Sequence, residues 1–297
     1  MCIYDSLVVD DTLAVAREAV QRHGRRFAEP ELLRSGANDV YVASDVVVRV
    51  ARTTVDVDRH VAIGEVLRRE GVPVPKPIAS GQHSGTNYSV WEYVRPDVQS
   101  VVQFEQFGAG IRLVHGIDPA VFDAYDLPWC DKAEWLALDR VLDLVKSAAL
   151  LPDDDVDLLA SNCDRLRGWG DRCRAAGRAV VCHGDVHPQN VVVRNSRATI
   201  IDWDTICIGP PQWDHAALLT WAERWGGHSR DYWSFAEGYG ETFASDPLAM
   251  ELAEIRLLAP TLNMIVKGAA SKRHANEAGL RMRFWRGELD PPTWTPQ

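Results

Sequence analysis

The sequence predicts an α+β fold in which antiparallel β-strands at the N-terminus precede a mostly helical C-terminal part. Short runs rich in β-branched residues recur up to about residue 93, whereas helical periodicity dominates from residue 98 onward. A β-hairpin within residues 180–204 interrupts the helical part. We therefore expect two lobes, residues 1–95 and residues 96–297, because Arg95-Pro96 favours an extended linker between them.

The first part alternates apolar runs with polar turns, which is typical of a β-meander. A helix is expected over residues 13–21 and another over residues 56–70, the latter ended by Gly71 and Pro73. Strands are expected over residues 31–35, 40–43, 46–51, 77–81 and 88–94.

The second part has the apolar spacing of helices on either side of the hairpin. Helices are expected over residues 101–115 and over about 132–150, and a further helix is expected to begin at Asp153. A long helical region with a kink at Pro260 is expected over residues 247–285. Trp213, Ala217, Trp221 and Trp225 recur at every fourth position, which predicts three indoles on one helical face. Such a face favours core packing over stacking against a substrate. The tail, residues 287–297, is expected to be irregular.

Composition and charge narrow the class of protein. The 297 residues carry a net charge of −10, which excludes a nucleic-acid partner and permits a cationic one. Six cysteines lack metal-binding spacing and read as reduced thiols. The N-terminal segment MCIYDSLVVDD has no basic region followed by a long apolar run. We therefore expect a cytoplasmic protein with no membrane partner.

The hairpin carries most of the recognisable chemistry. His183, Asp185 and Asn190 stand in H-x-D-x-x-x-x-N spacing, and Asp202 ends the second predicted strand, residues 199–202. The pattern matches the template for phosphoryl transfer, in which one carboxylate accepts a hydroxyl proton while an amide and a second carboxylate hold Mg²⁺. Any one of these residues alone would more simply satisfy backbone groups of a tight loop. All of them at these spacings indicate catalysis.

A longer pattern resembles a known family. The segment His183-Gly184-Asp185-Val186-His187-Pro188-Gln189-Asn190 is followed by Ile200-Ile201-Asp202-Trp203-Asp204 and by Gly209-Pro210-Pro211 before Trp213-Asp214. Together they resemble the aminoglycoside phosphotransferase and choline kinase family, which is similar in fold to two-lobed protein kinases. The resemblance implies that Asp185 is the catalytic base, that Asn190 and Asp202 bind Mg²⁺, and that Asp214 braces the loop.

The same resemblance assigns a nucleotide site to the first lobe. It implies that the turn Ser35-Gly36-Ala37-Asn38 covers the phosphates of ATP. Arg49 stands where the family carries a lysine, and Glu65 lies at the spacing of the family's helix glutamate. We expect Glu65 to pair with Arg49; an exposed pair between Glu65 and Arg69 is the alternative.

The adenine site is implied in the same way. Glu92, Tyr93 and Val94 would form a hinge whose main chain binds adenine, and three apolar side chains would enclose the ring. Those side chains are Val48, Val192 and Ile201. Ordinary core packing is compatible with this assignment.

The predicted activity is ATP- and Mg²⁺-dependent phosphorylation of a hydroxyl on a small molecule. An aminoglycoside or another antibiotic is the first expected acceptor; a macrolide, choline-like amine, sugar or amino acid is the alternative. Acidic residues between Asp118 and Asp131, with Glu134, are candidates for binding a polycation, and solvated surface is the simpler interpretation. A protein kinase and a catalytically weak pseudokinase that only binds are rival hypotheses. The sequence leaves open ATP against GTP, and a monomer against a homodimer.

Overall fold

The protein divides into two compact units. The computed structural model describes residues 9–24, 28–36, 38–53, 55–98, 101–290 and 293–295. The first unit comprises Met1–Gln103, Val121–Tyr125 and Gln189–Asp204, and the second comprises Phe104–Ala120, Asp126–Pro188 and Thr205–Gln297. The expected boundary at residue 95 differs from this division, because the hairpin after Gln189 groups with the first unit. The N-terminal residues 1–8, on which the absence of a leader was predicted, lie outside the described residues.

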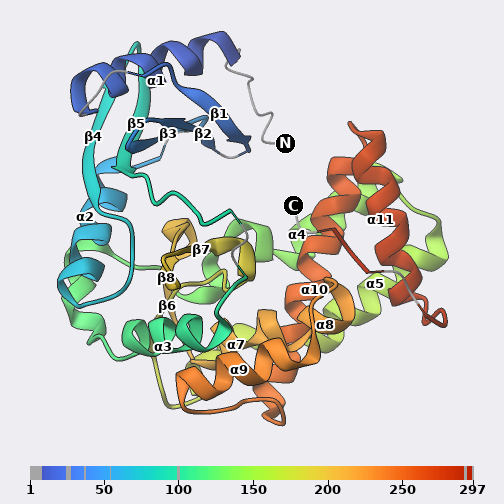
Figure 1. The fold of residues 1–297 in the computed structure, drawn as a ribbon. Coiled ribbons are helices and arrows are strands. Elements are labelled where there is room, and N and C mark those ends of the chain that lie inside the picture. The colour runs from blue at the N-terminus through green and yellow to red at the C-terminus, as the bar shows by residue number, and fades with distance from the viewer. Residues whose placement is uncertain are drawn as a thin grey trace. The chain divides into compact units, whose positions relative to one another are not determined.

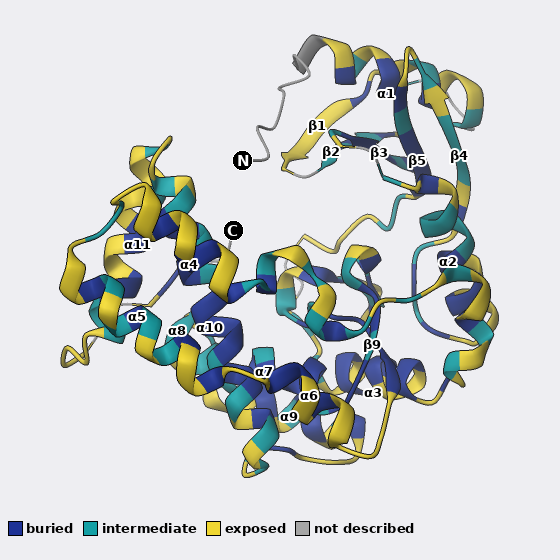
Figure 2. Ribbon diagram, turned by 180° about the vertical axis from the view of Figure 1, so that it is seen from behind, coloured by how far each residue is buried: buried dark blue, intermediate teal, exposed yellow. Residues whose placement is uncertain are grey.

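A five-stranded antiparallel sheet forms the first unit, as predicted (Figure 1). Its order is β1-β2-β3-β5-β4. The strands are β1 Glu31–Ser35, β2 Asn38–Ala43, β3 Val46–Ala51, β4 Pro77–His83 and β5 Thr86–Glu92. Helix α1, Val9–His23, packs on one face of this sheet, and β5 is almost entirely buried (Figure 2).

Alternation along β3 decides which residues face α1. Val46, Val48 and Val50 are buried in the core that α1 shares with the sheet. Val47 and Arg49 point to the opposite face, because successive strand residues alternate between faces. Only this second face can contribute β3 side chains to a ligand site.

Helix α2 and a short hairpin complete the first unit. The side chain of Asp56 caps α2, Val57–Arg69, by accepting a hydrogen bond from the amide of Arg59. The hairpin pairs β7, Val191–Arg194, with β8, Arg197–Ile200. Asn195 and Ser196 form its turn with φ angles of 51° and 59°, as a type I′ turn requires. The second strand therefore ends at Ile200, and Asp202 lies just beyond it.

The second unit is mostly helical, as predicted. Its elements are α3 Phe104–His115, α4 Leu138–Ser147, α5 Asp153–Leu166, α6 Trp169–Ala175, β6 Val180–Cys182, β9 Cys207–Gly209, α7 Gln212–Leu219, α8 Trp221–Arg224, α9 Ser229–Tyr239, α10 Pro247–Gly268 and α11 Lys272–Trp285. Two strands, β6 and β9, pair antiparallel. The loop that contains Asp185 follows β6, and the helix that contains Asp214 follows β9. Buried residues of α10 form a large part of the core of this unit.

Two helix predictions for this unit were wrong in detail. The expected helix over residues 132–150 is replaced by the 3₁₀ turns η2 Cys130–Lys132 and η3 Glu134–Leu136, followed by α4. The single helical region expected over residues 247–285 is interrupted at residues 269–271, and Pro260, the predicted kink, lies inside α10. The new helix starts there because the Ser271 side chain caps the amide of His274.

The expected tryptophan face does not form, because α7 ends at Leu219 and α8 begins at Trp221. Trp213 is buried and stacks on Trp169, whereas the partly exposed Trp221 and Trp225 stack on each other. These indoles pack within the second unit, as expected of aromatic residues at helical spacing.

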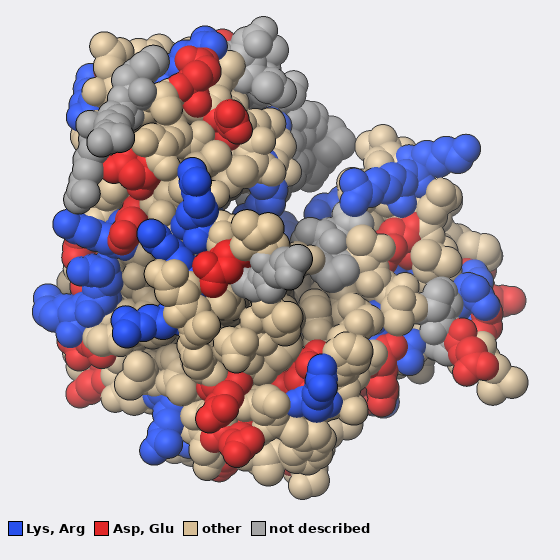
Figure 3. Space-filling model, viewed as in Figure 1, with Lys and Arg blue, Asp and Glu red and all other residues tan. Residues whose placement is uncertain are grey.

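Other sequence expectations concern the surface and the thiols. Within the described residues, no helix combines the length and apolarity needed to cross a membrane. Five cysteines are buried free thiols, and Cys2 lies outside the described residues. Acidic and basic side chains are interspersed over the face shown in Figure 3.

Candidate active site

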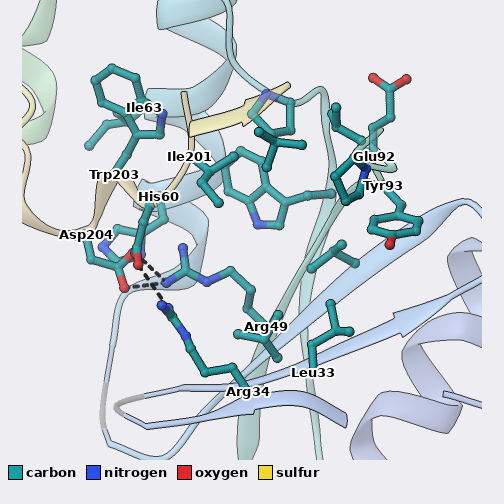
Figure 4. A pocket seen from close by; sticks show the side chains of 18 residues that line it. Leu33, Arg34, Arg49, His60, Ile63, Glu92, Tyr93, Ile201, Trp203 and Asp204 are labelled. Atoms are coloured by element: carbon teal, nitrogen blue, oxygen red, sulfur yellow. Dashed lines mark hydrogen bonds and ion pairs between the residues drawn. The ribbon is translucent and has the colours of Figure 1, made fainter. Parts of the chain in front are cut away.

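An apolar cavity of about 390 Å³ lies within the first unit (Figure 4). Glu92, Tyr93 and Val94, which follow β5, form one part of its lining. Val192 and Ile201 contribute from the hairpin. The structure thus brings the predicted hinge residues and two of the three predicted apolar residues to one cavity.

The assignment of Val48 to this cavity was wrong. Val48 is fully buried against α1, and its neighbour Val47 lines the cavity together with Val40. Because adjacent residues of a strand face opposite sides, Val48 and Arg49 could not both have reached the same site. The correct apolar residue could have been found from this alternation alone.

Trp91 also lines the cavity and was not predicted. Its indole Nε1 donates to the Ser89 hydroxyl over 2.9 Å, which fixes the ring. The ring packs over Gly64 of α2, where an added Cβ would lie only 2.6 Å from the Trp91 Cζ3 atom. A glycine at this position is therefore what admits the indole.

A group of charged side chains forms the polar part of the cavity. Arg49 Nη2 donates to Asp204 Oδ2 over 2.5 Å and to Asp202 Oδ1 over 3.2 Å. Arg34 Nη2 donates to Asp202 Oδ2 over 3.0 Å. Burial disfavours the charged guanidinium of Arg49, but the two carboxylates outweigh burial and raise its pKa. Arg49 is therefore a permanent cation at the cavity.

Glu65 does not take the predicted role. Its side chain is exposed on α2, and among the described residues no ion pair joins it to Arg49. His60 and Ile63 line the cavity instead, since residues three and four apart share a helical face that excludes position 65. Glu65 is exposed, as the alternative interpretation expected. Arg69, its expected partner in that alternative, forms its described ion pair with Glu70.

The turn between β1 and β2 contributes one contact to this polar group. Asn38 Nδ2 donates to Asp204 Oδ2 over 3.0 Å. The Gly36 amide closes the turn by donating to the Asn38 carbonyl oxygen, and the Ser35 side chain hydrogen-bonds to buried Asp39. Ala37 lies outside the described residues. Ser35 and Gly36 therefore shape the turn, and a contact of either with phosphate stays a prediction.

The two predicted metal ligands lie on the same hairpin. Asn190 is buried, and its carbonyl oxygen accepts a hydrogen bond from the amide of Ile201 over 2.9 Å. Asp202 has a positive φ of 66°, which is uncommon for a residue with a side chain. Their amide and carboxylate oxygens are the hard donors that Mg²⁺ prefers, so the residues present fit this ion.

In the second unit, Asp214 holds the loop that carries Asp185. Its carboxylate accepts hydrogen bonds from the amides of His183 and Gly184, each over 2.8 Å, and contacts His115 Nε2 at 2.9 Å. Burial opposes its charge, but the hydrogen bond and charge of His115 lower the pKa of Asp214. Gly184 has a φ of +86°, and an added Cβ would lie 2.1 Å from the Thr205 carbonyl oxygen. The loop thus requires glycine at this position.

The partly exposed carboxylate of Asp185 contacts an arginine and a histidine. Arg256 Nη2 donates to Asp185 Oδ1 over 2.7 Å, and His187 Nε2 lies 3.2 Å from Oδ2. Burial alone would raise the pKa of Asp185, but the contact with His187 and the charge of Arg256 hold it below its usual range. Asp185 is therefore an anion at neutral pH.

Arg256 is a residue of this site that the sequence interpretation missed. It is buried in α10, and its guanidinium lies over the rings of Trp213 and Trp135, 4.9 Å and 5.7 Å from their centroids. A lone arginine in the apolar segment Ile255-Arg256-Leu257-Leu258 was the available signal, because buried arginines are rare unless paired.

Comparison with known proteins identifies the family. A family model described as the phosphotransferase enzyme family (APH) matches residues 30–259 of this chain. The chain belongs to this phosphotransferase family. No curated protein matches the chain with significant similarity.

Solved structures with the same fold include members named for different substrates. Spectinomycin phosphotransferase APH(9)-Ia, solved with ADP and spectinomycin, has a TM-score of 0.64 at 16% identity, over 94% of this chain and 95% of that one. Amicoumacin kinase hAmiN, solved with AMP-PNP and Ca²⁺, has a TM-score of 0.68 at 14% identity, over 97% of this chain and 95% of that one. A choline/ethanolamine kinase family protein from Mesorhizobium loti has a TM-score of 0.68 at 18% identity, over 94% of this chain and 95% of that one. At these identities the likeness establishes the kinase-like fold of this phosphotransferase.

Proposed function

We propose that this phosphotransferase transfers the γ-phosphoryl group of ATP, with Mg²⁺, to a hydroxyl group of a small molecule. The observation that carries the proposal is the cavity of the first unit, which combines apolar walls with a partly buried arginine cation and two aspartates. Its volume of about 390 Å³ lies in the range of small-molecule sites. Such a cavity suits a flat apolar ring joined to an anionic group.

The roles within the cavity follow from its chemistry. Val192 and Ile201 would pack against the adenine ring, and the main chain of Glu92–Val94 would bind its polar edge. Arg49 would bind phosphate oxygens as a donor with a fixed charge. Asn190 and Asp202 would hold Mg²⁺, which neutralises charge on the transferring phosphoryl group when it is bound. The dependence of this activity on ATP is consistent with a cytoplasmic location.

Asp185 would act on the acceptor. Its carboxylate is ionised at neutral pH and partly exposed, so it can accept a hydrogen bond from a substrate hydroxyl. Its lowered pKa makes Asp185 a weak base. A weak base is sufficient when the transition state of phosphoryl transfer is loose, because the hydroxyl group then loses its proton late in the reaction. Asp185 would therefore orient the hydroxyl first and accept its proton afterwards.

The names of related structures suggest the class of acceptor molecule, and the ion pairs of the acidic residues limit how strongly a polycation is favoured. Solved members of the fold carry the names of spectinomycin, macrolide and amicoumacin enzymes, so an antibiotic of the aminoglycoside type or another antibiotic is our first candidate. Two acidic residues expected to bind a polycation already face arginines: Asp131 binds Arg174 at 2.7 Å, and Glu134 lies 3.9 Å from Arg140. A screen must therefore include weakly charged antibiotics and small metabolites.

An ATP-consumption screen tests this function. Purified protein with Mg-ATP is assayed against aminoglycosides, macrolides, choline-like amines, sugars and amino acids, and Asp185→Asn serves as the matched inactive variant. We expect one acceptor to gain a phosphoryl group, detected by mass spectrometry, in wild type alone. Nucleotide binding without turnover on every acceptor would favour the binding-module hypothesis. Strong transfer to a casein-like protein would favour a protein kinase.

A further inference from the structure

Two aspartates flank Trp203, and only one is needed for the metal role proposed above. Asp202 and Asp204 both contact Arg49, yet the family pattern assigns Arg49 a partner on α2, where Glu65 is exposed. We propose that Asp204 is the positioning residue for Arg49: it holds the guanidinium at the cavity and leaves Asp202 for the metal. This inference rests on the proposed function and deepens it.

The geometry favours Asp204 over every other described acid as this partner. Asp204 Oδ2 accepts from Arg49 over 2.5 Å, compared with 3.2 Å for Asp202 Oδ1. Asn38 donates to the same Asp204 oxygen, and His60 Nδ1 lies 3.6 Å from the other. The Arg49 side chain is 16% exposed and the Asp204 side chain 30% exposed, so only the arginine is largely covered. Contacts from Arg49, Asn38 and His60 on one carboxylate restrict its orientation, and with it the orientation of the guanidinium.

The conformation around Trp203 explains why Asp202 can bind a metal ion while Asp204 keeps its contact with Arg49. The Trp203 indole is buried, and its Nε1 donates to the Ile200 carbonyl oxygen over 3.2 Å, which anchors the segment between the aspartates. Asp202 is additionally bound by Arg34, whereas Asp204 is bound by Asn38. If Asp202 turns to a metal ion, Arg49 loses its longer contact and keeps the shorter one.

Arginine needs such a partner more than lysine does. Its guanidinium is planar, so its orientation as well as its position decides which phosphate oxygens it can reach. An arginine left with several rotamers would bind phosphate in many arrangements, and few of them would suit the reaction. Asp204 therefore acts through Arg49, and its removal is expected to lower kcat more than it raises the KM for ATP.

A double-mutant cycle tests the dependence of Asp204 on Arg49. We expect Asp204→Asn to lower kcat by about tenfold to a hundredfold, as two residues in direct contact commonly couple, and Asp204→Glu to restore part of the loss. In an Arg49→Ala background, Asp204→Asn is expected to have no further effect. Glu65→Gln is the matched control on α2 and is expected to equal wild type.

A second measurement needs neither nucleotide nor metal. Phenylglyoxal labels accessible arginines, and mass spectrometry locates the label. In the ligand-free protein we expect Arg49 to label several-fold faster in Asp204→Ala than in wild type or in Glu65→Gln. Thermal unfolding of every variant shows whether the fold is kept; Asp204→Asn and Asp204→Glu are the milder substitutions if Asp204→Ala does not fold.

The outcomes separate the inference from the proposed function. A wild-type enzyme with turnover, combined with unchanged kcat in Asp204→Asn, would overturn the role of Asp204 alone. An effect that persists in the Arg49→Ala background and raises the Mg²⁺ concentration required would identify Asp204 as a metal ligand, which also overturns it. A wild-type protein that binds no nucleotide would overturn the proposed function, while the labelling of Arg49 would still report on the pair.

Discussion

Arg256 joins the catalytic candidate Asp185 to the backbone of its own loop. One guanidinium nitrogen donates to Asp185 Oδ1 over 2.7 Å, and another donates to the Gly184 carbonyl oxygen over 2.8 Å. The rings of Trp213 and Trp135 lie against the same guanidinium. A buried side chain of α10 thereby fixes both the charge and the position of a carboxylate that lies 71 residues earlier in the chain.

The first prediction concerns this arginine. Arg256→Ala should lower kcat by about a hundredfold, because a small displacement of Asp185 misaligns the acceptor. Loss of the positive charge should also raise the pKa of Asp185, so the acidic limb of the pH profile of kcat/KM should move to higher pH. Arg256→Lys should recover part of both effects. A fall in thermal stability with an unmoved acidic limb would show that Arg256 is only structural.

The second prediction separates the acceptor side from the nucleotide side. Asp185→Asn should abolish phosphoryl transfer while ATP affinity changes little, because this carboxylate is proposed to serve the acceptor. Asp202→Asn should instead weaken the binding of Mg-ATP, because it removes a proposed metal ligand. Isothermal titration of Mg-ATP into each variant measures the difference. Equal losses of nucleotide affinity in both variants would contradict these roles.

The third prediction uses two neighbours on β3. Val47→Ala removes an apolar contact of the cavity and should weaken nucleotide binding, with little effect on folding. Val48→Ala leaves a cavity in the core beneath α1 and should lower the free energy of unfolding by about 1–3 kcal/mol, with nucleotide affinity kept. Both variants are measured by urea unfolding and by nucleotide titration, so each variant serves as the control for the other. The reverse pattern would place the nucleotide on the other face of the sheet.

The fourth prediction concerns His215, which is buried among Tyr232, Phe235, Tyr239 and Phe243. Burial, with a smaller effect from His115, lowers the pKa of His215 to about 3. The unfolded chain takes up this proton near about pH 6.5. Between these values the unfolded state binds more protons, so the stabilising contribution is complete above pH ~6.5 and is lost as the pH falls.

His215→Phe should remove this dependence. Between about pH 7.5 and about pH 5, the free energy of unfolding should fall by about 2 kcal/mol more in wild type than in the variant, measured by urea unfolding. The other titrating groups are shared by both proteins, so the difference isolates His215. Parallel pH dependences would mean that folding leaves the pKa of His215 unchanged, which would contradict the prediction.

Much of the fold followed from local patterns. Alternating β-branched runs predicted the five strands of the first unit, and the paired glycine and proline signals after Glu70 predicted the end of α2. The spacing of His183, Asp185 and Asn190, with Asp202, identified the reaction class that the family match supports. These features depend on residues close in sequence, where backbone geometry limits what each can do.

The partners of the charged groups were decided by tertiary structure. Arg49 lies 155 residues before Asp204, and no local periodicity relates the two. Spacing suggested Glu65 instead, but the rotation of α2 presents His60 and Ile63 to the cavity. An ion pair forms where the fold brings two side chains together away from water, and that condition is global. Local sequence patterns were enough to predict a phosphotransferase, which the family match supports, whereas the pairing of charged side chains depends on contacts that only the folded chain makes.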